Sequence, residues 1–408
     1  MTRQPSERTS VGDHRKSFAR SGEWPPLAYG FRPFFLLGAL FAALAVPLWL
    51  AAYMGDVALP AALPASLWHG HEMLFGYGTA VLAGFLLTAT PGWSGRPPIT
   101  GAGLAALVAI WLAGRVATSA GGAIPAVAAA VDLAFLPALA LAVAPALRAA
   151  ARRNLVFLPM LGVLVLANLA VQLDALDVLP GAGSSALRAA LDLFVLLIAL
   201  IGGRIVPAFT ASALSARGEA ARPRPLSARD RLAIGVLVIL VLADVAGRAR
   251  LAGGIALAAA VLNGWRLYGW GGSRTLRQPI LWVLHLGYAW LAIGLAWKGL
   301  IDLTQLAPPA DALHGLAIGA IGTMTLAVMS RAALGHTGRP LHAPWPIVAS
   351  YLLISAAALA RLATVLAPEQ LALPLLVLSA ASWSLAYLAF AVRFGPILLQ
   401  PRADGRAG

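Results

Sequence analysis

Residues 34–54 read FFLLGALFAALAVPLWLAAYM, an apolar stretch without a charged side chain. A helix of about 20 residues spans the hydrocarbon core of a bilayer, so this stretch is long enough to cross a membrane. Similar stretches recur along the chain, which is 60% hydrophobic and 11% charged and has a mean hydropathy of +0.81. Because a soluble domain carries about 25% charged residues, the composition predicts an all-α polytopic membrane protein.

Breaks at proline and glycine divide the chain into twelve predicted spans. Their expected limits are 34–54, 66–89, 102–120, 123–147, 154–173, 187–209, 231–247, 252–268, 279–300, 311–331, 344–366 and 371–394. Basic residues are enriched in cytoplasmic loops. With twelve spans, all but six of the basic residues fall on one side, and the six exceptions are Arg115, Arg188, Arg248, Arg250, Lys298 and Arg361. We therefore predict a twelve-helix bundle with both termini inside.

The transmembrane domain is expected over residues 28–398. Residues 1–27 are mostly polar and arginine-rich and have no signal-peptide pattern, which favours a disordered cytoplasmic tail. Residues 399–408 form a second cytoplasmic tail in this interpretation. We find no convincing internal repeat, so the sequence gives no support to a transporter-like inverted repeat.

The absence of cysteine excludes disulfides, zinc–thiolate sites, iron–sulfur clusters and covalently attached haem. A metal must then be held by histidine, methionine, carboxylate or backbone groups. The net charge of +14 is explained by the cytoplasmic loops, and no basic face with interleaved aromatic residues is present. We therefore expect the lipid bilayer as a partner and no nucleic acid.

Histidines in or beside the apolar spans are the strongest candidates for chemistry, because polar side chains inside a bilayer are costly and mark functional sites. They are His69, His71, His285, His314 and His336. The orientation puts the first two and His314 in the outer turns of their spans, where all three could converge. His285 and His336 fall on the inner side and could form a second site. For any one of them, the alternative is an interhelical hydrogen bond.

His69 and His71 lie about 200° apart on a regular helix. They can therefore serve two separate centres. Alternatively, the helix begins after His69 and both rings bend toward one metal. Neutral imidazole suits haem iron and copper, and a nearby carboxylate often orients such a ligand. Glu72 is the candidate orienting carboxylate.

Four arginines lie beside proline or glycine at the predicted inner face: Arg32, Arg96, Arg204 and Arg339. Arginines at one depth could clamp haem propionates or another anion through bidentate hydrogen bonds. The alternative is ordinary cytoplasmic anchoring. Tyr288, three residues after His285 on the same helix face, completes the candidate cofactor-binding residues.

Long motifs across the chain resemble the NnrS family over roughly residues 27–408. They are GFRPFFLLGALFA from Gly30, WHGHEMLFGYG from Trp68, GFLLTATPGWSGRPP from Gly84, LIGGRIVPAFT from Leu200, LWVLHLGYAWLAIGL from Leu281, HGLAIGAIGTMTLAVMSRAALGHTGRPL from His314 and RFGPILLQPRADGRAG from Arg393. The resemblance implies a twelve-span bacterial inner-membrane protein with haem and copper that responds to nitric oxide during denitrification or nitrosative stress. By position, it implies the five histidines as metal ligands. Without cysteine, the haem would be non-covalent and b-type.

The leading functional hypothesis is a haem/copper membrane protein that binds nitric oxide and reduces or otherwise detoxifies it. Turnover as a nitric oxide reductase-like oxidoreductase is left open, and membrane quinol is the candidate electron donor. A looser likeness links the twelve spans and the His-x-His pair to haem–copper oxidases, although the order of histidines differs. The alternatives are a transporter or permease for copper or a small anion, and a structural membrane protein with hydrogen-bonded histidines.

Overall fold

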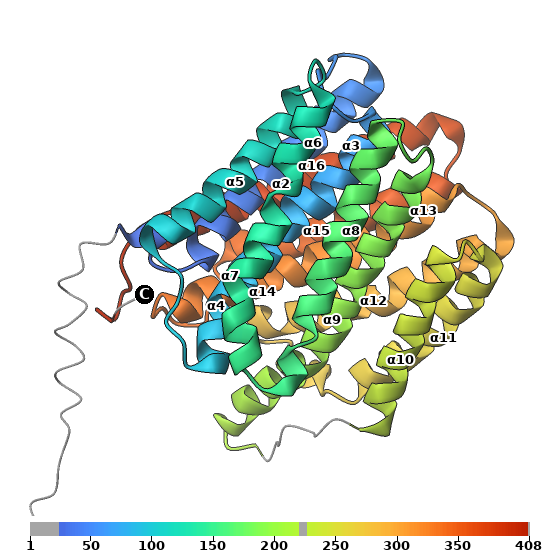
Figure 1. Cartoon of the computed structure of the whole chain (residues 1–408). Coiled ribbons are helices and arrows are strands. Elements are labelled where there is room, and N and C mark those ends of the chain that lie inside the picture. The colour runs from blue at the N-terminus through green and yellow to red at the C-terminus, as the bar shows by residue number, and fades with distance from the viewer. Residues whose placement is uncertain (1–23, 220–226, 407–408) are drawn as a thin grey trace, which may run out of the picture.

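The structure is a computed structural model that describes residues 24–219 and 227–406. Every element within these two ranges is a helix, which confirms the all-α prediction. The helices form one bundle, and both ends of the described chain lie at the same end of it (Figure 1). We call this the terminal end and the opposite one the far end. The predicted tail of residues 1–27 falls mainly outside the described residues.

A helix occupies each of the twelve predicted spans. Those with one continuous α-helix are α2 (Phe31–Met54), α5 (Gly101–Ala120), α8 (Phe157–Ala175), α9 (Ala182–Ser215), α10 (Ala228–Val245), α11 (Ala249–Tyr268), α12 (Pro279–Thr304), α15 (Trp345–Leu366) and α16 (Glu369–Leu399). Helices α6 (Pro125–Leu133) and α7 (Phe135–Ala149) divide another span. Helix α9 continues to Ser215, beyond the predicted limit at residue 209, because Thr210, Ala211 and Leu214 are buried.

Ten helical segments in the described residues are long and apolar enough to cross a membrane, as expected of a multi-pass membrane protein. Helices α10 and α11 are not among them. Helix α10 carries Arg229, Asp230, Arg231 and Asp244 within 18 residues, which lowers its apolar character. The count of twelve and the side of the membrane that each end faces therefore stay predictions.

Two spans share an unusual construction. One consists of α3 (Ala65–His71), the π-helix η2 (Glu72–Gly78) and α4 (Thr79–Ser94), and the other of α13 (Pro309–His314), the π-helix η5 (Gly315–Gly322) and α14 (Thr323–His336). Each begins with a matching motif, PASLWHG at 64–70 and PADALHG at 309–315. This repeat is only seven residues long, too short to stand out as an internal repeat in the sequence. Since π-helices are rare and cluster at functional sites, the pair points to the region that follows His69 and His314.

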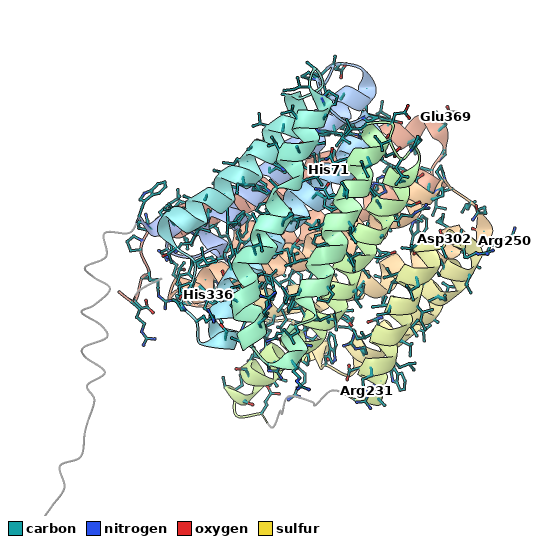
Figure 2. All side chains as sticks on the ribbon, in the orientation of Figure 1. His71, Arg231, Arg250, Asp302, His336 and Glu369 are labelled. Carbon is teal, nitrogen blue, oxygen red and sulfur yellow. The ribbon has the colours of Figure 1, made fainter. Side chains whose placement is uncertain are left out.

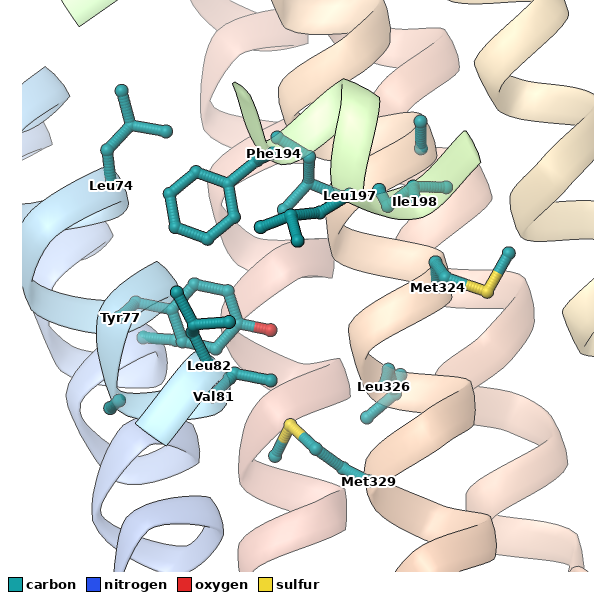
Figure 3. Close-up of a cluster of buried hydrophobic side chains, with 14 of the residues drawn as sticks. Leu74, Tyr77, Val81, Leu82, Phe194, Leu197, Ile198, Met324, Leu326 and Met329 are labelled. Atoms are coloured by element: carbon teal, nitrogen blue, oxygen red, sulfur yellow. The ribbon is translucent and has the colours of Figure 1, made fainter. Parts of the chain in front are cut away.

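The core between these two spans is filled by apolar side chains from three directions (Figure 3). They include Leu74, Tyr77 and Val81 from the first span, Phe194, Leu197 and Ile198 from α9, and Met324, Leu326 and Met329 from α14. Small residues bring the second span close to α12, since a methyl group at Gly294 would lie 2.8 Å from the carbonyl carbon of Gly315. Such close backbone approach is typical of helix packing in membranes.

Candidate functional site

A cavity of about 550 Å³ lies between the two π-helical spans and is closed by parts of α2, α9, α15 and α16. Most of its lining is apolar, for example Leu74, Leu191 and Trp383. Its charged or metal-capable lining residues are His69, His314, Met73, Arg188 and Arg361. Ligand sites in proteins have volumes of about 300–1,000 Å³ and combine an apolar wall with a few polar groups, so this cavity has the size and lining of a cofactor site.

His69 and His314 lie next to each other in this cavity. Their ring centroids are 6.5 Å apart and their planes differ by 13°. The ring of Trp49 stacks on His69 with a centroid separation of 4.2 Å. The two spans with the repeated motif thus bring His69 and His314 to one place at the far end of the bundle, and the side of the membrane on which they lie stays a prediction.

The hydrogen bonds of this pair leave nitrogen lone pairs available. Nδ1 of His314 donates to the carbonyl oxygen of Ala310 at 2.9 Å, so that its Nε2 carries the lone pair. Nδ1 of His69 is buried and has no hydrogen-bond partner in the described part of the chain. A histidine that binds a metal almost always donates its other ring N–H to a carbonyl or carboxylate. His314 has this arrangement, and His69 has an unmet nitrogen.

These residues fit a metal that brings further ligands of its own. Metal–imidazole bonds are about 2.0 Å long, so two imidazoles on one ion have ring centroids about 6 Å apart. In the described residues, no group of three or more histidine or acidic side chains is arranged to hold a metal ion. A porphyrin would supply the remaining ligands. Arg188 and Arg361 are the basic residues of the cavity lining that could pair with its propionates. Arg361 is held in place by an ion pair with Asp311.

His71 lies on the other side of α3 and does not join this pair, so the expected convergence of three histidines is wrong. Its Nδ1 is 3.0 Å from Oε1 of Glu72, and its Nε2 is 3.1 Å from Oδ2 of Asp132. Nε2 also lies 2.9 Å from Oδ1 of Asn168. The reason is geometric, because α3 is regular and residues two apart face opposite sides. Of the two alternatives for the His-x-His pair, the structure shows opposite orientations.

An arginine completes this buried network around His71. Arg115 bonds Oε2 of Glu72 at 2.5 Å and also pairs with Asp132. Thr118 donates to Glu72 at 2.7 Å, and Gln172 donates to Asp132 at 2.9 Å. Glu72 does contact a histidine, as predicted, but it is shared with Arg115. Both nitrogens of His71 face carboxylate oxygens, so neither has a free lone pair for a metal. The role of His71 as a metal ligand stays a prediction.

The two histidines predicted for the inner side have different neighbours. Nε2 of His285 lies 2.9 Å from the hydroxyl of Thr210, and its Nδ1 is buried beside Gly272 without a hydrogen-bond partner in the described residues. His336 is exposed at the terminal end and packs on Phe31 with a centroid separation of 5.5 Å. Figure 2 shows His336 at the opposite end of the bundle from His71. The described contacts therefore give each inner histidine its own surroundings, and a shared inner site stays a prediction.

The other predicted cofactor-binding residues are dispersed. Arg32 donates to the carbonyl oxygens of Leu398 and Gln400 at 2.9 and 2.7 Å and lies near Arg339. Arg96 is exposed, and Arg204 is partly buried on α9. The hydroxyl of Tyr288 donates to Asn263 at 2.7 Å and also bonds Arg266. Arg32 thus ties α2 to the last carbonyls of α16, and binding of a cofactor by these residues stays a prediction.

The C-terminal tail is tied to the terminal end of the bundle. Arg402 donates to the carbonyl oxygen of His336 at 2.6 Å and pairs with Asp404 at 2.6 Å. The adjacent guanidinium keeps the pKa of the Asp404 carboxyl well below its usual value. This contact fixes the end of α14, so the predicted tail of residues 399–408 includes an ordered segment.

Comparison with known proteins agrees with the motifs quoted above. No curated protein matches the sequence. The profile of a protein family described as "NnrS protein" matches residues 25–402, which is nearly the whole chain and includes all five candidate histidines. The chain therefore belongs to the NnrS family.

Proposed function

We propose that this protein binds nitric oxide at a non-covalent haem held in the cavity between the two π-helical spans. The family is linked to the nitric oxide response. The observation that carries the proposal is the pair of nearly parallel imidazoles, with ring centroids 6.5 Å apart, each of which has a nitrogen that no group within residues 24–219 and 227–406 occupies. The remaining lining is mostly apolar, which favours a flat macrocycle and an uncharged diatomic over an ion in transit.

The chain's own residues divide the work at this site. One imidazole of the pair would hold the iron, and the other would have to give way to nitric oxide or hold a copper ion. When bound, haem iron with an open axial position supplies affinity for diatomic ligands. Arg188 and Arg361 line the cavity and would balance the charge of the propionates. Reduction of bound nitric oxide with membrane quinol as electron donor stays a prediction.

The proposal is tested by the absorption spectrum and haem content of the purified protein. We expect a Soret band that shifts with nitric oxide, and a loss of haem in both His69→Ala and His314→Ala. His342→Ala is the matched control, because His342 is exposed in a loop and lies outside the cavity. Full haem content in both cavity variants would refute the assignment. A folded but colourless wild-type protein would favour the alternative of a transporter for copper or a small anion.

A further inference from the structure

A second polar cluster lies beside the histidine cavity and centres on a buried lysine. Nζ of Lys298, on α12, bonds Oδ1 of Asp244 on α10 at 3.0 Å. It also bonds Oδ2 of Asp302, one turn further along α12, at 2.5 Å. Lys298 is only 2% exposed. An ammonium buried in a membrane bundle requires such partners, because an unpaired charge there is very costly.

A third carboxyl in this cluster has no donor. Asp192 projects from α9, is 2% exposed and lies within hydrogen-bonding reach of Asp244. Neither oxygen of Asp192 has a partner in the described part of the chain, and Oδ2 of Asp244 has none either. Two ionised carboxylates are both acceptors and repel each other. A hydrogen bond between them therefore needs one proton, as in other pairs of neighbouring carboxyls.

The count of charges leads to the same conclusion. Asp244 from α10 and Lys298 and Asp302 from α12 act on Asp192. Arg188, one turn before Asp192 on α9, acts on Asp302 and lines the same small cavity as Asp244 and Lys298. With every group ionised, the cluster carries three negative charges and two positive ones. One proton on the pair Asp192–Asp244 makes it neutral.

A small cavity lies between this cluster and the histidine cavity. It has a volume of about 70 Å³ and is lined by Arg188, Asp244, Lys298 and Asp302. Water occupies about 30 Å³ per molecule in the liquid, so there is room for a few molecules. Three residues line both this cavity and the larger one: Arg188, Pro309 and Leu313. Gly247 and Gln305, in turns at the far end, also line it, which places one side of the cluster near the aqueous phase.

We propose that Asp192 and Asp244 share one proton and form, with Lys298, a proton-binding site inside the membrane next to the histidine cavity. The pair exchanges its proton with the small cavity. The pair also delivers protons to the larger cavity through the wall at Arg188, a role that rests on the proposed function. Reduction of two nitric oxide molecules to nitrous oxide and water takes up two electrons, here from quinol, and two protons. A proton site adjoining the haem cavity would serve that step.

Infrared spectroscopy of the folded protein tests the shared proton without any cofactor. We expect the wild type at neutral pH to show a carboxylic acid C=O band that shifts in heavy water. Both Asp192→Asn and Asp244→Asn should lose it completely, because each leaves two positive and two negative charges. Asp56→Asn, at an exposed position, should retain it. Lack of the band in the wild type, or its persistence in both cluster variants, would overturn the proposal even if a variant proves difficult to fold.

A second measurement separates the proton site from the haem assignment. Haem content of Asp192→Asn should equal that of the wild type, while nitric oxide consumption with a quinol should fall at least tenfold. Equal consumption by Asp192→Asn and wild type would overturn the delivery role. A wild type without haem would refute the proposed function and the delivery role together, and the infrared result would still decide whether the carboxyl pair holds a proton.

Discussion

His69 and His71 stand two residues apart in the last turn of α3, and their surroundings are opposite in kind. His69 faces an apolar cavity, stacks between Trp49 and His314 and keeps a buried nitrogen without a partner. His71 faces a network in which two carboxylates occupy both of its nitrogens. The same residue type in one motif therefore has open coordination capacity on one side of the helix and none on the other.

A histidine is therefore a candidate ligand when one of its ring nitrogens has no hydrogen-bond partner, and a structural residue when both nitrogens are bonded. Buried polar groups in proteins are nearly always satisfied, so exceptions call for an explanation. Around His71, an arginine, two carboxylates, a threonine and two amides give both ring nitrogens partners, although Nε of Arg115 has none in the described part of the chain. The cavity around His69 departs from that rule, and a cofactor would supply the missing partner.

The largest effect is expected from Arg115→Met, which tests whether the His71 side is structural. Removal of one partner from a buried ion network costs about 3–5 kcal/mol, because it leaves the other charges unpaired. Glu72 and Asp132 would both lose their guanidinium. We expect a loss of this size in the free energy of unfolding, measured by detergent-induced unfolding in mixed micelles, with an unchanged haem-to-protein ratio in the folded fraction.

The control for that experiment is Arg248→Met, the same substitution at an exposed arginine at the far end. It should change the free energy of unfolding by less than about 0.5 kcal/mol. Stability equal to the wild type in Arg115→Met, together with a loss of haem, would reverse the comparison and move the cofactor to the His71 side.

The fold could be predicted from the sequence because its signal is composition over long windows. The twelve apolar stretches all form helices, and their limits lie within six residues of prediction, with the largest difference at the C-terminal end of α9. The π-helices could not be predicted, since they depend on packing between spans and leave no distinct composition. The separation of His71 from His314 could not be predicted either, because it depends on the side chains of Asp132, Asn168 and Gln172, which reach Nε2 of His71 from other helices.

The distribution of basic residues along the sequence also indicates where the polar sites of the bundle lie. Six basic residues violate the predicted charge asymmetry, and the structure shows why four of them are tolerated. Arg115 pairs with acids in the His71 network, Arg361 with Asp311, and Lys298 with Asp244 and Asp302, while Arg188 lines both cavities. Exceptions to the charge rule thus mark the polar sites of this bundle, whereas Arg248 and Arg250 are exposed.

A smaller and more direct test exchanges the two histidines of the motif one at a time. His71→Ala removes hydrogen bonds to charged groups, which are worth about 1.5–3 kcal/mol, so its free energy of unfolding should fall by about 2–3 kcal/mol while haem content stays. His69→Ala should lower haem content with little change in the stability of the haem-free protein. Haem loss in His71→Ala at unchanged stability would contradict this assignment and restore His71 as a ligand.

The smallest effect concerns the ring that orients His69. Trp49→Leu removes the stacking partner 4.2 Å from His69 but leaves the cavity apolar. Loss of a group that orients a metal ligand lowers metal affinity by about 10–100-fold. Because Trp49 is only partly buried, the effect of its loss should lie at the lower end of this range. We therefore expect haem to dissociate about tenfold faster, measured by transfer to a haem acceptor in solution, at nearly unchanged stability. Trp49→Phe retains an aromatic face and should restore most of the retention. Equal dissociation rates in wild type, Trp49→Leu and Trp49→Phe would mean that His69 is held by its neighbours on α3 alone, and the contrast with His71 would then rest only on hydrogen bonding.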